Sequence, residues 1–188
     1  MRRLLVFMLV AGMGVSAGAQ SPVQVAVQRL AKKKFVQGDV RTVGNTTWYS
    51  SNQADASLTL RITVRNISIS PIDGAVVRWG VAKTRLAGNS RAGDMAYGRE
   101  EKCSLKPLGT QIIETETVEA ARRESQLSQQ AFGEKIRGHG VQVLIGGRVV
   151  WEEFVPATVR KSFENLRPVG EQEPAENPVR TGKTSKKQ

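Results

Sequence analysis

The chain is poor in the residues from which catalytic and metal sites are most often built. Its 188 residues include one cysteine, Cys103, and one histidine, His139. A single cysteine excludes a disulfide within the chain, and one cysteine with one histidine falls short of the three or four ligands that a zinc site needs. We therefore expect no enzyme, no metal ion and no cofactor. Cys103 itself is expected to be buried, to be a free exposed thiol, or to form a disulfide with another molecule.

Long apolar runs are missing beyond the N-terminus, where a short one is present. Arg2 and Arg3 precede the apolar run Leu4–Val10, and small residues follow at positions 17–19. This order is typical of a cleaved secretory signal peptide, and the run is shorter than the ~20 residues that span a bilayer. We predict a signal peptide over residues 1–19, no transmembrane segment, and a periplasmic or extracellular location.

Acidic residues are outnumbered by basic ones. The formal net charge of +11 becomes +9 when the two arginines of the signal peptide are removed. The excess is spread over Lys32–Lys34, residues 78–106 and the C-terminal lysines. Such a charge attracts polyanions. Export argues against nucleic acid as the partner and favours an anionic envelope polymer or lipid head groups, while a solvated basic surface with no specific partner is the alternative.

Alternating apolar and polar residues mark two central strands. Leu58, Leu60, Ile62 and Val64 alternate with polar residues, which predicts a half-buried strand. A turn with Pro71 and Asp73-Gly74 follows, and a second alternating stretch over residues 75–82 places Trp79 on its inner face.

Gly146-Gly147 marks a tight hairpin between residues 141–145 and 148–154. Two glycines suit the turns with positive φ that match the twist of paired strands. The turn predicts that Ile145 pairs with Arg148 and that the next three pairs follow in step. The step-by-step pairs are Leu144 with Val149, Val143 with Val150 and Gln142 with Trp151.

The other segments give weaker patterns. We expect further strands at Val23–Val27, Thr46–Ser50 and Gln111–Val118, a long loop or loose edge strand over residues 86–102, and a surface turn or short helix over residues 119–130. From about Leu166 the chain is rich in Pro, Glu and Lys, which is typical of a disordered tail.

About seven short strands with turns between them predict an all-β, antiparallel β-sandwich over residues 20–157, followed by a linker and disordered basic tail over residues 158–188. The alternating strand that ends at Asn66, the connection to Pro71, the inward Trp79 and the Gly-Gly hairpin resemble the immunoglobulin-like and fibronectin type III-like modules of bacterial exported proteins. The resemblance implies a sandwich that binds, spaces or assembles, and it lacks the paired cysteines of antibody domains.

Aromatic residues make up 5% of the chain, so each exposed one is a candidate contact for a partner. Trp48 and Tyr49 are adjacent in an expected strand, so one of them faces away from the core. Tyr97 lies in the glycine-spotted segment. These three residues are the candidate partner-binding residues, and packing within the sandwich is the alternative for each.

Glu114 with Glu116, Glu152 with Glu153, and His139 are the only groups that could support hydrolysis. We expect the carboxylates to lie on solvated strand faces and His139 to lie in a turn. Asn45 and Asn66 begin motifs that spell glycosylation acceptors, which we expect to be accidental in a bacterial exported protein.

Three functions are compatible with these patterns. The first is a non-enzymatic envelope protein that binds a protein or an anionic polymer through loops or a basic face. The second is an accessory subunit or chaperone that acts by adding a strand at a sheet edge. The third, which the residues support least, is a hydrolase of envelope polymers.

Overall fold

The computed structural model describes residues 21–88 and 90–169, and it is almost entirely β-structure. The predicted signal peptide and the tail from residue 170 lie outside the described residues. The elements are β1 (Val23–Val36), β2 (Val40–Val43), β3 (Thr46–Tyr49), β4 (Asn52–Asn66), β5 (Ile72–Gly88), β6 (Ser90–Leu105), β7 (Thr110–Glu114), β8 (Val118–Glu124), β9 (Ala131–Ile145), β10 (Arg148–Val155), the 3-10 helix η1 (Ala157–Asn165) and β11 (Leu166–Arg167).

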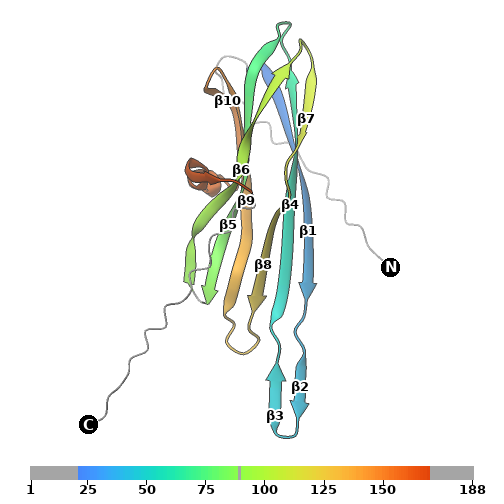
Figure 1. Cartoon of the computed structure of the whole chain (residues 1–188), viewed down its shortest axis with the longest axis vertical. Coiled ribbons are helices and arrows are strands. Elements are labelled where there is room, and N and C mark those ends of the chain that lie inside the picture. Colours follow the sequence, from blue (N-terminus) through green and yellow to red (C-terminus); the bar gives the residue numbers. More distant parts are fainter. Residues whose placement is uncertain (1–20, 89, 170–188) are drawn as a thin grey trace, which may run out of the picture.

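The strands form two layers that face each other across one core (Figure 1). We call β1, β4, β7 and β8 the β4 layer, and β5, β6, β9, β10 and β11 the β5 layer. The layers are joined where β8 and β9 pair, so the strand order runs β1-β4-β8-β9-β5-β6-β11. Every pair is antiparallel except β6 with β11. The predicted all-β, sandwich-like class is therefore confirmed, with eleven strands in the described residues instead of about seven.

The core forms where the predicted alternation is strongest. Leu60, Ile62 and Val64 of β4 are completely buried. They share one apolar cluster with Val77 and Trp79 of β5, which come from the opposite layer. Burying one face of each strand between two layers removes apolar surface from water, and this burial is the main driving force for the fold.

The strand β4 changes its partner halfway along its length. Residues 61–65 pair with β7, and residues 52–58 pair with β8. At the change, the Thr115 hydroxyl accepts the Leu60 N–H at 2.8 Å, and the Thr115 N–H donates to the Leu60 carbonyl at 2.9 Å. These two bonds replace the missing ladder contacts at a buried position, where an unpaired N–H would be costly.

The helix η1 covers the outer face of the β5 layer. Gly98, Gly80 and Gly140 are in register across β6, β5 and β9, so this patch carries no side chains. Phe163 packs onto the patch and is buried, and its ring meets that of Phe154 edge-on with centroids 5.1 Å apart. Residues 158–167, whose composition predicts a linker, are therefore part of the folded body, and β11 pairs with Ala96 and Tyr97 of β6.

Of the two alternatives for residues 86–102, a long loop or a loose edge strand, the strand is confirmed. β5 and β6 form a long hairpin that turns around Gly88, whose φ is +67°, and on its other side β6 pairs only with the two residues of β11 within the described residues. Of residues 119–130, expected as a surface turn or short helix, only residues 125–130 form a turn, which links β8 to β9. Residues 119–124 belong to β8, because pairing with β4 buries Val118 and Ala120 and overrides the helix-favouring composition.

The Gly146-Gly147 turn is present, and both glycines have positive φ. Ile145 pairs with Arg148 and Leu144 with Val149, as predicted. A bulge then leaves Val150 without a partner in the ladder, so Val143 pairs with Trp151 and Gln142 with Glu152. The two outer pairs of the prediction are wrong by this one residue.

Candidate functional site

A basic groove lies beside the core cluster, next to Leu58 and Ile136. It encloses about 420 Å³ and is lined from β1, β4, β8 and β9. We define the basic groove by all of its lining residues: Arg29, Ala31, Lys32, Lys33, Lys34, Phe35, Ala54, Asp55, Ala56, Ser57, Leu58, Ala120, Arg122, Glu134, Lys135, Ile136, Arg137 and Gly138. Seven of these are Lys or Arg and two are Asp or Glu, so the lining carries a formal charge of +5.

The register explains how these residues come together. The face of β1 that packs on the core as Val25 and Val27 continues as Arg29, Ala31, Lys33 and Phe35. The matching face of β4 changes from Leu58 to the small residues Ala56 and Ala54. Large apolar side chains therefore stop and small ones begin, which leaves a hollow with long basic side chains at its rim.

Most of the positive charge in the basic groove is not neutralised. Lys83 binds Glu134 at 2.5 Å, so one of the two acidic residues of the lining is already paired. Arg137 has only a 3.8 Å contact with Asp94. Arg29, Lys33 and Lys135 have no ion pair within the described part of the chain. Unpaired cations along a partly apolar hollow suit an anionic ligand.

The strands β2 and β3 form a two-stranded ribbon, residues 40–49, at one end of the long axis (Figure 1). Trp48 is 65% exposed and Tyr49 is 46% exposed, and they point to opposite faces of the ribbon. Both predicted partner-binding residues are thus on the surface, as a partner contact requires. Their role in binding stays a prediction.

The third predicted partner-binding residue, Tyr97, is buried at 6% exposure on β6. It does not lie in an exposed loop, because the segment around it is a strand that pairs with β5, where Tyr97 lies opposite Val81. Lys83 Nζ lies 4.3 Å from the centroid of its ring, a cation–π contact that holds the lysine beside the core. Tyr97 therefore presents no aromatic surface to a partner.

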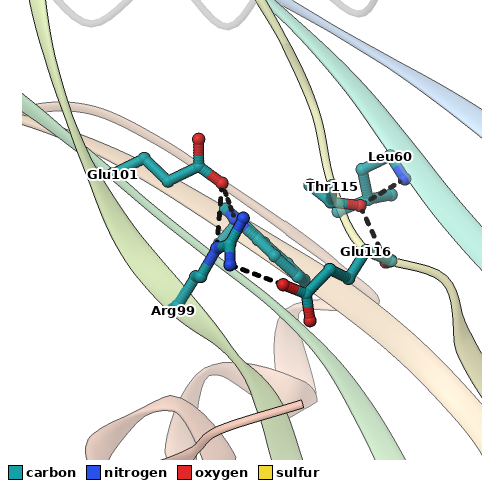
Figure 2. Close-up of polar contacts among 6 residues, drawn as sticks. Leu60, Arg99, Glu101, Thr115 and Glu116 are labelled. Atoms are coloured by element: carbon teal, nitrogen blue, oxygen red, sulfur yellow. Dashed lines mark hydrogen bonds and ion pairs between the residues drawn. The ribbon is translucent and has the colours of Figure 1, made fainter. Parts of the chain in front are cut away.

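Glu114 and Glu116, the two carboxylates expected on one strand face, each bind a different arginine. Glu114, at the end of β7, forms an ion pair with Arg61 of β4. Glu116, beyond the strand, binds Arg99 Nη1 at 2.5 Å, and Arg99 also binds Glu101 at 3.1 Å (Figure 2). Glu101 in turn accepts the Trp79 indole N–H at 3.2 Å. Glu116 thus links the segment after β7 to β6 of the opposite layer, whereas Glu114 pairs within its own layer, and the two acids are held by different arginines.

His139 lies within β9, not in a turn, and it is completely buried opposite Val81. Its Nε2 lies 3.5 Å from Glu153 Oε1, and neither ring nitrogen has a hydrogen-bond partner within the described residues. Glu152 is engaged elsewhere, with Arg160 at 2.9 Å and Gln142 at 3.1 Å. The structure therefore brings His139 near one carboxylate, and no serine or cysteine nucleophile is hydrogen-bonded to its ring within the described residues.

Cys103 is buried on β6 as part of the core cluster, which is the first of the three expected states. Burial, and in second place the charge of Glu101, raises the pKa of its thiol. Within residues 21–88 and 90–169, no three His, Cys, Asp or Glu side chains lie close enough to hold a metal ion. No helix in these ranges has the length and apolarity to cross a membrane.

Sequence reasoning found the Lys32–Lys34 run but missed the basic groove as a unit. Arg122 and Lys135 join Lys33 only because β8 and β9 fold back beside β1 and β4. Arg29 and Lys33 lie on the same face of β1 as Val25 and Val27. Basic residues on a core-facing side of a strand were the one available signal of the groove, and this signal can be recognised only once the register with β4 is known.

Comparisons with known proteins add little. No family model matches the chain, and no curated protein matches it. Among solved structures, a crystal structure of a protein from Akkermansia muciniphila is similar over 78% of this chain and 81% of that chain, at 15% identity and a TM-score of 0.30. A similarity this distant carries no argument about function.

Proposed function

We propose that this chain is an exported, non-enzymatic binding protein that holds an anionic component of the cell envelope in the basic groove. The observation that carries the proposal is the set of three unpaired cations, Arg29, Lys33 and Lys135, around one partly apolar hollow. Phosphate or carboxylate groups would pair with these cations, and Ala54, Ala56 and Ile136 would contact apolar parts of the ligand.

The location and the finer fold type are parts of the same proposal. The N-terminal order of basic, apolar and small residues supports export. The inward Trp79 and the Gly-Gly hairpin support an immunoglobulin-like or fibronectin type III-like sandwich. Export would keep the positive charge away from nucleic acid and leave envelope polyanions as its partners.

A binding role is favoured over hydrolysis by the state of the candidate carboxylates. Glu114 and Glu116 are each occupied by an arginine, from different strands. His139 is completely buried, which leaves it out of reach of a polymer chain. A general acid or base must contact the proton that it transfers, and none of these groups is placed on an open hollow.

The test compares two triple variants of the mature protein that remove equal charge. One carries Arg29→Gln, Lys33→Gln and Lys135→Gln in the basic groove. The control carries Lys102→Gln, Lys106→Gln and Arg148→Gln, which are exposed and outside it. Binding to immobilised heparin, used as a model polyanion, should fall much further in the groove variant. Equal losses in both variants would show that net charge alone drives binding and would overturn the proposal.

Strand addition at a sheet edge is a second candidate, favoured by β1. Along its 14 residues this strand pairs with β4 alone, so its other edge is open within the described residues. Lys32–Lys34 lie on that edge, and lysines at an edge usually oppose strand addition. Purification from the native host tests this candidate, because recovery of the protein without a bound polypeptide would count against it.

A further inference from the structure

The ribbon exposes apolar side chains and lacks negative charge. Residues 40–49 contain Arg41 and no Asp or Glu. Val43 is 58% exposed and lies on the same face as Trp48 and Arg41. Two paired strands that contact no core cannot bury these groups within the described part of the chain. Exposed apolar surfaces of this kind usually mark a contact site for a protein, a membrane or another ligand.

The base of the ribbon is held in place by hydrogen bonds. The Gly38 N–H donates to Asn52 Oδ1 at 2.9 Å, and Gln126 Nε2 donates to the Gly38 carbonyl at 2.7 Å. The Ser50 N–H donates to the Asp39 carbonyl at 2.9 Å. A Cβ on Gly38 would lie 2.2 Å from the Ser50 carbonyl oxygen, so only glycine fits here. The ribbon therefore projects in a fixed direction from the β1–β4 pair.

The ribbon and the basic groove belong to one continuous surface. A second hollow of about 440 Å³ lies between them and is lined by Phe35 and Val40 among others. Phe35 also lines the basic groove, and Val40 begins β2. An object that lies along this side of the molecule can therefore contact the ribbon and the cations of the groove together.

We infer that this end of the molecule docks on an anionic lipid bilayer, with Trp48 and Val43 in the interfacial region and the cations of the basic groove against lipid head groups. The inference rests on the proposed function and names its partner. Tryptophan and tyrosine favour the membrane–water interface because one end of the ring system is apolar and the other is polar. Nearby lysines and arginines add attraction to anionic head groups, about fivefold in affinity for each charge close to the surface.

A bilayer is favoured over a protein partner by the composition of this end. The ribbon offers Trp48, Tyr49, two valines and a cation, but no carboxylate. Most protein surfaces carry both signs of charge, and a docking face for one would usually offer both. An anionic membrane offers a single sign of charge above an apolar layer, which matches the apolar ribbon and the net charge of +5 in the lining of the basic groove.

Sedimentation with vesicles tests the inference on the mature protein. The probes are vesicles of phosphatidylcholine alone and vesicles that also contain phosphatidylglycerol. The ribbon variant carries Trp48→Ala and Val43→Ser. The matched control is Ile69→Ala, which removes an 87% exposed apolar side chain from the β4–β5 connection, at the other end of β4. Thermal unfolding of each variant checks the fold, and heparin binding checks the groove.

The expected result is binding to the phosphatidylglycerol vesicles only. The ribbon variant should lose about tenfold or more of this affinity while it keeps its heparin binding, and Ile69→Ala should lose none. The fluorescence of Trp48 should shift to shorter wavelength on binding, since Trp79 is already buried and Trp151 is partly buried against the core cluster. A Trp48→Phe variant identifies the source of the shift.

Three results would overturn the inference. One is vesicle binding that is unchanged in the ribbon variant. Another is loss of heparin binding together with vesicle binding in that variant, which would make the ribbon a general recognition element for soluble partners. The third is heparin binding by the wild type without vesicle binding, in which case the proposed function stands and the bilayer does not. Binding to neither probe would overturn both.

Discussion

Gly140 of β9 lies directly beneath Phe163 of η1: a Cβ at this glycine would lie 2.6 Å from Phe163 Cζ and 2.5 Å from Phe154 Cδ1. The absence of a side chain therefore lets η1 reach the sheet. We predict that Gly140→Ala lowers the free energy of unfolding by about 1–3 kcal/mol, because both rings must move. Urea unfolding of the variant measures this loss.

The control for that change is Gly93→Ala. A Cβ at Gly93 would meet nothing within 4 Å, and its φ is not in the left-handed region. We expect its midpoint of unfolding to stay close to that of the wild type. Equal midpoints for the Gly140 and Gly93 variants would contradict the close packing of η1.

Thr115 tests the point where β4 changes partners. Thr115→Val keeps the shape of the side chain but removes the acceptor of the buried Leu60 N–H. A buried donor left unpaired costs about 1–3 kcal/mol, so the free energy of unfolding should fall by that amount. Thr117→Val is the matched control, because its hydroxyl bonds only the exposed Thr59 hydroxyl, and it should change stability by less than about 0.5 kcal/mol.

Asn66 should be a structural residue and not an acceptor of glycans. It is completely buried, its amide donates to the carbonyls of Ser70 and Lys106, and its Oδ1 accepts two bonds from Ser68. We predict that Asn66→Ala costs about 1–3 kcal/mol of unfolding free energy. Asn45→Ala, at the exposed turn of the ribbon, should leave the thermal midpoint nearly unchanged.

Cys103 should react slowly with thiol reagents in the folded protein. Burial and the charge of Glu101 raise its pKa, so less of the reactive thiolate is present at a given pH than for a free thiol. Folding favours the neutral thiol over the thiolate. The contribution of Cys103 to the free energy of unfolding is therefore fully present below the ordinary pKa of a thiol, and it is lost as the pH rises through the raised pKa. Alkylation followed by mass spectrometry measures the rate.

The comparison for Cys103 is the same reaction in denaturant, where modification should be fast and complete. Electrophoresis without reductant should show one monomer band. Rapid labelling of the native protein, or a disulfide-linked dimer, would contradict the buried position.

Strands with strict alternation were predictable, and β4 and the inner face of β5 around Trp79 are the clearest cases. Their side chains decide the structure locally, because period two places every second residue in the core. The Gly-Gly turn was predictable for a similar reason, since its conformation depends on two adjacent residues. The bulge at Val150 was not, because no residue type marks it.

Features that depend on distant partners were not predictable from the sequence alone. The composition of β8 favours a helix, and only its ladder with β4 makes it a strand. Tyr97 and His139 are surrounded by glycines that suggest turns. The structure uses these glycines as positions without a side chain inside strands: the backbone of β5 lies close to Gly98, β10 to Gly138, and both β10 and η1 to Gly140. The basic groove likewise needs four strands that are far apart in the chain.

The position of η1 also orders events during synthesis. Ribosomes make a chain from its N-terminus, and the β1–β4 pair can form as soon as Asn66 has been made. The β5 layer is completed later. β5 pairs with β9 on one side, and Phe163 covers the glycine patch, so both contacts can form only after these later segments have been made. A truncation before residue 163 would leave that patch open to water or to a neighbouring chain. The final folding step therefore belongs to one of the last segments of the described chain to be made.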